Sequence, residues 1–100
     1  IKIDPILFDA FVGQYEDAEN LGGTIFSFFR EGEKFYTQVI NQDKIEIFPA
    51  SETNFFLKDP MADATFVKDS SGRVTAMIWR QGGRAEHLRG PTPSLRRRRG

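Results

Sequence analysis

The side chains that could carry out chemistry in this chain are few and far apart. A serine nucleophile needs a base nearby and a sharp turn or helix to present its hydroxyl, as in a glycine-flanked elbow or a Ser-x-x-Lys pair. The residues three positions after Ser27, Ser51 and Ser70 are arginine, asparagine and arginine, so none of these serines fits such a pattern. The chain has no cysteine, which excludes a thiol nucleophile and a thiolate metal ligand.

The one histidine, His87, lies near the end of the last expected strand. A lone histidine needs carboxylate partners to hold a metal ion, and the adjacent Glu86 would point to the opposite face of a strand. Acidic residues such as Glu31 and Glu33 flank a turn, where carboxylates are usually solvated. We therefore expect no catalytic residue, no metal site and no cofactor, and we expect that this chain alone is not an enzyme.

The length and charge of the chain limit its function further. One hundred residues make one domain with one core. The 14 basic and 14 acidic residues balance, but four of the basic ones form the run Arg96 to Arg99, and the rest of the chain is mildly acidic. Because basic residues do not cluster elsewhere, we interpret this run as a solvated tail and expect no nucleic-acid partner.

No part of the sequence predicts a membrane span or an export signal. The apolar runs are far shorter than the roughly 20 residues that a spanning helix needs, and the first residues lack a basic segment followed by an apolar one. The absence of cysteine suits an oxidising or a reducing compartment equally. Since the chain begins at Ile1, we interpret it as a domain of a longer polypeptide, with a processed product as the alternative.

The first element is expected to be a short helix. Asp4 is a suitable N-cap, Pro5 suits the first helical position, and Phe8 and Phe11 recur at helical spacing before Gly13. After Gly13 the pattern changes to short stretches rich in aromatic and β-branched residues, separated by turn residues. Six such stretches are clear and two more are plausible, at residues 23–30, 34–40, 45–49, 54–58, 64–68 and 73–79, with 13–16 and 84–88 in addition.

Short glycine-containing turns join several of these stretches, at Gly32, Gly72 and the pair Gly82 and Gly83. Short turns between consecutive strands indicate an antiparallel up-and-down meander, and this spacing is typical of an all-β sandwich or barrel. We expect about eight strands in a domain over residues 1–90. Residues 91–100, rich in proline and arginine, are expected to form a flexible tail.

The ten phenylalanines have two possible uses. In one, the strands fill the barrel with their side chains, and in the other some of these side chains line a cavity for an apolar ligand. A barrel of about eight strands has an interior that side chains can just fill, which favours a filled core. The residues expected to fill it are Phe26, Phe28, Phe35, Val39, Val74, Ala76 and Ile78.

Adjacent aromatic residues must point to opposite faces of a strand, so Phe29 and either Phe55 or Phe56 should leave the interior. The N-terminal helix would cover them through Phe8 and Phe11, or they would form a patch that docks another protein. Trp79 shares the face opposite Val74. It is a candidate anchor for a partner if it faces outward, and otherwise a core residue. The candidate interaction or ligand-contact residues are therefore Phe29, Phe55, Phe56 and Trp79.

Three motifs, in this order, resemble a known bacterial family. They are VGQYE at Val12 to Glu16, FPASETNFF at Phe48 to Phe56, and the segment from Thr65 to Gly83, within a likeness that runs from about Asp4 to Arg89. Together they resemble the domain of unknown function found C-terminal to β-lactamase-related serine hydrolases and penicillin-binding-protein-like peptidases.

This resemblance implies a lipocalin-like antiparallel barrel that is not itself catalytic. The active site, with its Ser-x-x-Lys motif, would lie in another domain, and the barrel would act in oligomerisation or in shaping substrate access. The expected partner is a serine hydrolase domain of the same parent chain or a second copy of this chain. The alternative is a small barrel that binds an apolar molecule in its interior. If the parent hydrolase is exported, the domain would be periplasmic or extracellular.

Overall fold

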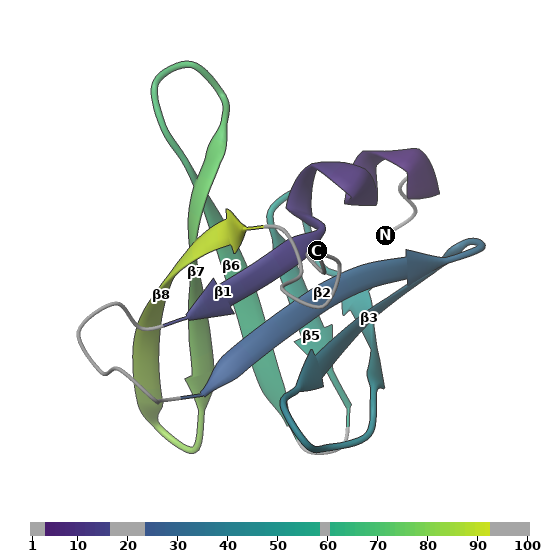
Figure 1. Cartoon of the computed structure of the whole chain (residues 1–100), viewed down its shortest axis with the longest axis vertical. Helices are drawn as coiled ribbons and strands as arrows, with labels where there is room; N and C mark the ends of the chain where they lie inside the picture. Colours follow the sequence, from purple (N-terminus) through teal and green to yellow (C-terminus); the bar gives the residue numbers. More distant parts are fainter. Residues whose placement is uncertain (1–3, 17–23, 59–60, 93–100) are drawn as a thin grey trace, which may run out of the picture.

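A computed structural model of the chain describes residues 4–16, 24–58 and 61–92. In this part of the chain one short 3₁₀ helix precedes eight strands that close into a barrel (Figure 1). The elements are η1 (Pro5–Phe11), β1 (Gly13–Glu16), β2 (Ile25–Glu31), β3 (Lys34–Val39), β4 (Ile45–Pro49), β5 (Asn54–Leu57), β6 (Ala62–Lys68), β7 (Val74–Gln81) and β8 (Arg84–Thr92).

Each strand pairs in antiparallel fashion with its neighbours in the sequence, and β1 pairs with β8 to close the sheet. The predicted all-β, up-and-down barrel of eight strands with a short N-terminal helix is thus confirmed. The predicted stretches coincide with the strands to within a few residues, because side-chain alternation and turn residues mark them locally. No helix in the described residues is long and apolar enough to cross a membrane.

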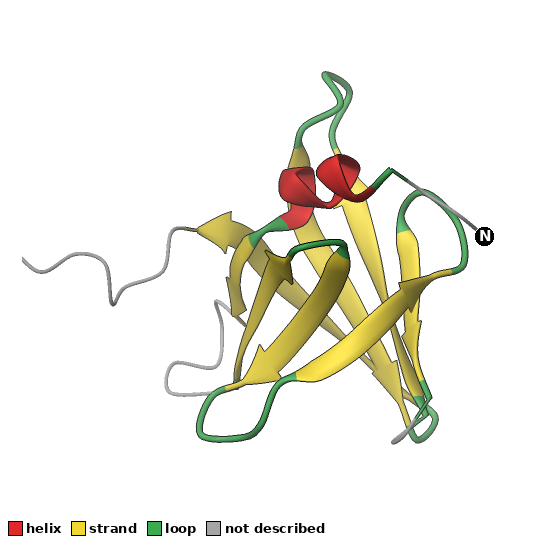
Figure 2. Cartoon of the chain, turned by 90° about the vertical axis from the view of Figure 1, so that its right-hand side faces the viewer, coloured by secondary structure: helices red, strands yellow, loops and turns green. Residues whose placement is uncertain are grey.

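The helix begins where the sequence predicted. The Asp4 carboxylate accepts a hydrogen bond from the backbone N–H of Ile6 at 3.1 Å, and Pro5 occupies the first turn. Figure 2 shows η1 lying across one end of the barrel. Its two aromatic rings point inward, where Phe8 stacks on Phe35 at 4.8 Å between centroids and Phe11 stacks on Phe66 at 4.4 Å. The helix is therefore a plug for this end of the barrel.

The interior is filled by aromatic and aliphatic side chains. Phe26, Phe28, Phe35 and Val74 are buried there as predicted, and Val39 packs against them. Nearly every ring in the core contacts another ring at 4.4–6.0 Å in stacked, edge-on or tilted geometry. The residues with the largest fully buried side chains are Tyr15, Phe28, Phe35, Phe55, Ile47, Leu57, Met77, Leu88 and Thr37.

The predicted faces of β7 were wrong for Ala76 and Ile78. Lys68 of β6 pairs with Val74, but the next residue back, Val67, pairs with Ala76, so Thr75 is an extra residue in β7. This β-bulge reverses the alternation after Val74. Met77 and Trp79 consequently point into the barrel, while Ala76 and Ile78 are only partly buried on its outside.

Two glycines allow β1 and β8 to approach closely enough to close the sheet. A Cβ atom on Gly13 would lie 2.5 Å from the Cβ of Pro91, and Gly13 also has a φ of 143°, which favours glycine. A Cβ atom on Gly90 would collide with the carbonyl oxygen of Gln14 and lie 2.7 Å from the ring of Tyr15. The seam, which we define as the pairing of β1 with β8, therefore tolerates no side chain at Gly13 or Gly90.

The last strand is longer than predicted. β8 ends at Thr92, two residues beyond the predicted domain end at residue 90, and the Thr92 hydroxyl donates to the carbonyl oxygen of Gln14 at 3.3 Å. Residues 93–100, including Arg96 to Arg99, lie outside the described part of the chain. The tail predicted there stays a prediction.

Tyr15 joins the first strand to the plug. Its side chain is completely buried, and its hydroxyl donates a 2.9 Å hydrogen bond to the carbonyl oxygen of Phe11, the last residue of η1. Burial raises the pKa of Tyr15 above the ordinary tyrosine value, because the phenolate would lose its hydration. The folded chain thus holds this proton more tightly than the unfolded chain does.

The seam predicts a large effect of a single methyl group. Gly90→Ala should lower the free energy of unfolding by about 2–3 kcal/mol, because the added Cβ cannot avoid the backbone of β1 and the Tyr15 ring. Gly32→Ala is the control, since its Cβ would meet nothing within 4 Å and only its positive φ costs energy, about 1 kcal/mol. Urea unfolding measures both. Equal losses for the two variants would contradict close packing at the seam.

The buried tyrosine predicts a loss of stability in alkali. Its contribution is complete below the unfolded-state pKa of about 10, and is lost as pH rises further because only the unfolded chain then releases the proton. Urea unfolding above about pH 10 should show stability falling by up to about 1.4 kcal/mol per pH unit. Tyr15→Phe keeps the ring and should flatten this slope. An unchanged slope in that variant would mean that another group is responsible.

Candidate functional site

The serine hydroxyls of the described residues mainly stabilise turns and backbone groups. Ser51 accepts hydrogen bonds from the backbone N–H groups of Thr53 and Asn54, at 3.3 and 3.1 Å. The Ser71 hydroxyl donates to Asp69 at 2.7 Å, and this bond, aided by backbone donors, lowers the pKa of Asp69. No group of three or more histidine, aspartate or glutamate side chains that could hold a metal ion occurs in residues 4–16, 24–58 and 61–92.

His87 lies in the middle of β8, directly opposite Ile78 of β7, and is exposed. Its position pairs with a residue on the outside of the barrel, so the imidazole belongs to the outer surface. Leu88, the next residue, is buried inside. The histidine is thus at the surface, as the sequence suggested, but it lies in the middle of the last strand and not near its end.

The four predicted contact residues separate into two inside and two outside. Phe55 is completely buried, and its ring contacts Phe8 and Phe11 at 5.7 and 5.6 Å. Trp79 is 7% exposed and its ring packs on Phe26 at 4.6 Å. Phe29 and Phe56 are only partly buried and lie on the outward side of β2 and β5.

The outward aromatic residues pair with other rings and with lysine side chains. Phe29 stacks on Tyr36 of β3 at 5.7 Å, and Phe56 packs on Phe48 of β4 at 5.7 Å. The expectation that η1 covers them was wrong, because its rings contact residues inside the barrel. Instead, the ammonium group of Lys44 lies 4.7 Å from the Tyr36 ring, and that of Lys58 lies 4.6 Å from the Phe48 ring.

The pKa of Lys44 is raised by its hydrogen bond to Glu31, whose carboxylate oxygen is 2.6 Å from the ammonium nitrogen. This ion pair joins the end of β2 to the segment before β4 over the ring of Tyr36. Both side chains are about half exposed, at 44% and 50%, so the pair adds little stability. Its effect is to orient a cation over an outward aromatic ring.

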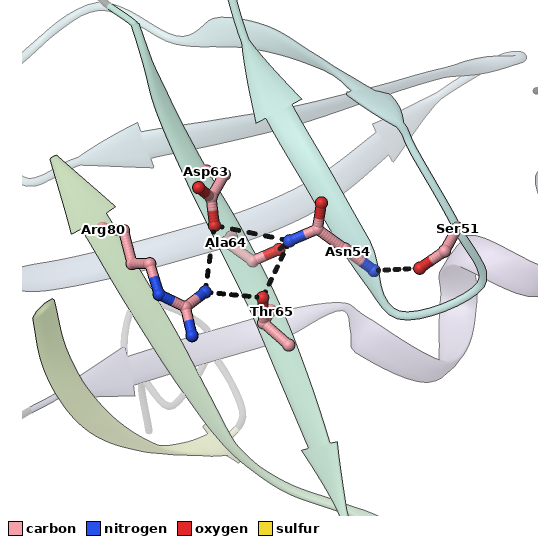
Figure 3. A network of polar contacts seen from close by, with 6 residues as sticks. All are labelled: Ser51, Asn54, Asp63, Ala64, Thr65 and Arg80. Carbon is pink, nitrogen blue, oxygen red and sulfur yellow. Dashed lines mark hydrogen bonds and ion pairs between the residues drawn. The ribbon is translucent and has the colours of Figure 1, made fainter.

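A polar network crosses the outer face of β5, β6 and β7 (Figure 3). The side-chain amide of Asn54 donates to Thr65 at 2.7 Å and, more weakly, to Asp63 at 3.3 Å. From the other side, Nη1 of Arg80 donates to Thr65 at 3.1 Å and to Asp63 at 3.3 Å. The network fixes the guanidinium of Arg80 against β6 through Nη1 alone, and Nε and Nη2 make no hydrogen bond with the described residues.

A hollow of about 860 Å³ lies beside this network, at the end of the barrel opposite η1. We call it the rim hollow. Two rows of residues across the strands form it. In the outward row, Phe56, Asp63, Arg80 and Ala85 pair in succession. The inward row consists of Leu57, Ala62, Gln81 and Arg84, and the turn residues Lys58 and Met61 and the glycines of the β7–β8 hairpin complete the lining.

A second hollow of about 450 Å³ occupies the open mouth of the barrel at the same end. Phe26, Val39 and Trp79 form its apolar base, and the indole N–H of Trp79 donates to Gln81 at 3.0 Å. Most of its other lining residues are polar or charged, namely Thr24, Gln42, Gln81, Arg84 and Glu86. Trp79 therefore lines the base of this mouth hollow and does not face outward as an anchor for a partner.

The sequence prediction named Phe56 but missed the other residues of the rim hollow. Two signals were available. Met61 is a large apolar residue in a turn and is 82% exposed, and an arginine stands on each side of the hairpin in the stretch RQGGR. The pairing that brings these residues beside Phe56 comes from the register of four strands, which single-sequence patterns do not reveal.

Comparison with known proteins gives one informative match. Residues of this chain are 28% identical, over 87 residues, to penicillin-binding protein 4* of Bacillus subtilis (strain 168). The match includes 87% of this chain but spans only 19% of that protein. No family model matches the chain, and no solved structure does so significantly. The chain is therefore similar to one segment of a larger penicillin-binding protein.

Proposed function

We propose that this chain is a non-catalytic accessory domain of a penicillin-binding-protein-like serine hydrolase. The observation that carries the proposal is the extent of the match, which takes in most of this barrel but only a fifth of the larger protein. The motifs that resemble the domain following β-lactamase-related hydrolases support the same placement. If the hydrolase is exported, the domain works in the periplasm or outside the cell.

The arrangement of side chains favours a role at the outer surface and the open end. The side chains of the described residues fill the barrel from η1 to Trp79, which weighs against an enclosed apolar ligand there. The outside keeps partly buried aromatic residues, among them Phe29 and Phe56, that a neighbouring domain or a second copy would bury further. The proposed role is oligomerisation or shaping of access to the active site of the hydrolase domain.

A non-catalytic domain should not react with penicillin. The chain, incubated with a fluorescent penicillin and separated under denaturing conditions, should carry no covalent label, because the described serines stabilise turns and backbone groups. A purified penicillin-binding protein serves as the positive control. Stoichiometric labelling that one Ser→Ala substitution abolishes would overturn the proposal that the chain lacks its own active site.

If the outer aromatic residues mediate self-association, native mass spectrometry should detect a defined oligomer at micromolar concentration. The double variant Phe29→Ser, Phe56→Ser should raise its dissociation constant at least about tenfold, since truncation of an aromatic hot spot costs about 2 kcal/mol or more. Ile78→Ser, another outward apolar change, is the matched control and should leave the oligomer intact. A monomer at all concentrations would leave only the role in substrate access.

A further inference from the structure

The rim hollow is an open depression that is large enough for a small molecule. Its volume of about 860 Å³ falls in the usual range for ligand pockets, roughly 300–1,000 Å³. Phe56, Met61 and Ala85 give it an apolar surface, and Met61 is 82% exposed. A side chain of this kind gains free energy when an apolar group covers it. The hollow therefore offers an apolar body a place to bind.

Among the described residues that line the hollow, positive charges outnumber negative ones. Its described lining carries three cations, Lys58, Arg80 and Arg84, and one carboxylate, that of Asp63. Asp63 is already engaged by Asn54 and Arg80. Arg84 has no ion pair or side-chain hydrogen bond with any described residue, and Arg80 keeps Nε and Nη2 available. This balance contrasts with the mildly acidic chain outside the arginine run.

The closed sheet limits what kind of partner can use this place. The strands around the hollow, β5 to β8, each have a paired neighbour on both sides, so a peptide cannot extend the sheet by adding a strand. An occupant must be recognised by side chains, through apolar contact and charge. Guanidinium groups suit a planar carboxylate, which they bind with two parallel hydrogen bonds.

We propose that the rim hollow binds a small monocarboxylate with a short apolar body. The apolar body lies against Phe56, Met61 and Ala85, and the carboxylate binds Arg84 with help from Arg80. The site is outside the filled core. It shares Gln81 and Arg84 with the mouth hollow, but its apolar surface of Phe56, Met61 and Ala85 does not line that hollow. It does not depend on the accessory role proposed above, and a chain that binds no carboxylate can still be an accessory domain.

Sodium octanoate is a suitable probe, and 1-octanol is its neutral counterpart. Two-dimensional amide NMR of the chain measures the binding of each compound. Octanoate should saturably shift the amide signals of Gly82, Gly83 and Ala85, and should bind more tightly than octanol. Arg84→Gln should weaken octanoate binding roughly tenfold, the effect of losing one charge-assisted contact. Arg89→Gln is the matched control, an exposed arginine on the same strand that is outside the hollow, and should bind octanoate as the parent chain does.

A second variant tests the apolar half of the site. Met61→Ser changes an exposed turn residue, so the fold should persist, and it should weaken octanoate and octanol alike. Four results would each overturn the proposal: no saturable shift, shifts centred on Phe26 and Trp79, equal affinity for octanoate and octanol, or equal weakening by Arg84→Gln and Arg89→Gln. The last would indicate attraction by general positive charge instead of a site.

Discussion

Closure of the sheet between β1 and β8 is the constraint on which the rest of the structure depends. It requires the backbones of Gly13 and Gly90 to lie where no side chain would fit, against Pro91 and Tyr15. Once the seam is closed, the barrel has no unpaired edge strand among the described residues, and its inward side chains share one enclosed volume. Contacts with other molecules must then be made by outward side chains or at the two ends of the barrel.

The two ends of the barrel differ in a way that follows from what fills them. At one end the rings of Phe8 and Phe11 are inserted by η1 and stack on Phe35 and Phe66. At the other end no element of the described residues covers the opening. The inward positions of β7 and β8 are occupied there by Gln81, Arg84 and Glu86, which are exposed. Solvent reaches these polar groups, and the hollows lie at this end, whereas the core between Trp79 and η1 is buried.

Much of the fold was predictable because its signals are local. Asp4 followed by Pro5 marks the helix start, and the glycine turns mark where strands reverse. The facing of β7 was not predictable, because one extra residue at Thr75 reverses every later side chain and has no sequence signature of its own. The plug was missed for a similar reason, since helical spacing shows that Phe8 and Phe11 share a face but not which surface that face meets. The rim hollow depends on a register across four strands, which no local pattern encodes.

The polar network on β5 to β7 orders Arg80, one of the positive charges at the open end of the barrel. Arg80 is held by one nitrogen, Nη1, against Thr65 and Asp63, and Asn54 supports both acceptors from the other side. The remaining donors of this guanidinium are left for solvent or a ligand, and the geometry is set before any ligand arrives. Such preorganisation lowers the entropy lost on binding, because the side chain is already ordered. The same argument does not apply to Arg84, which makes no such contact with the described residues, so its ordering would draw on the free energy of binding itself.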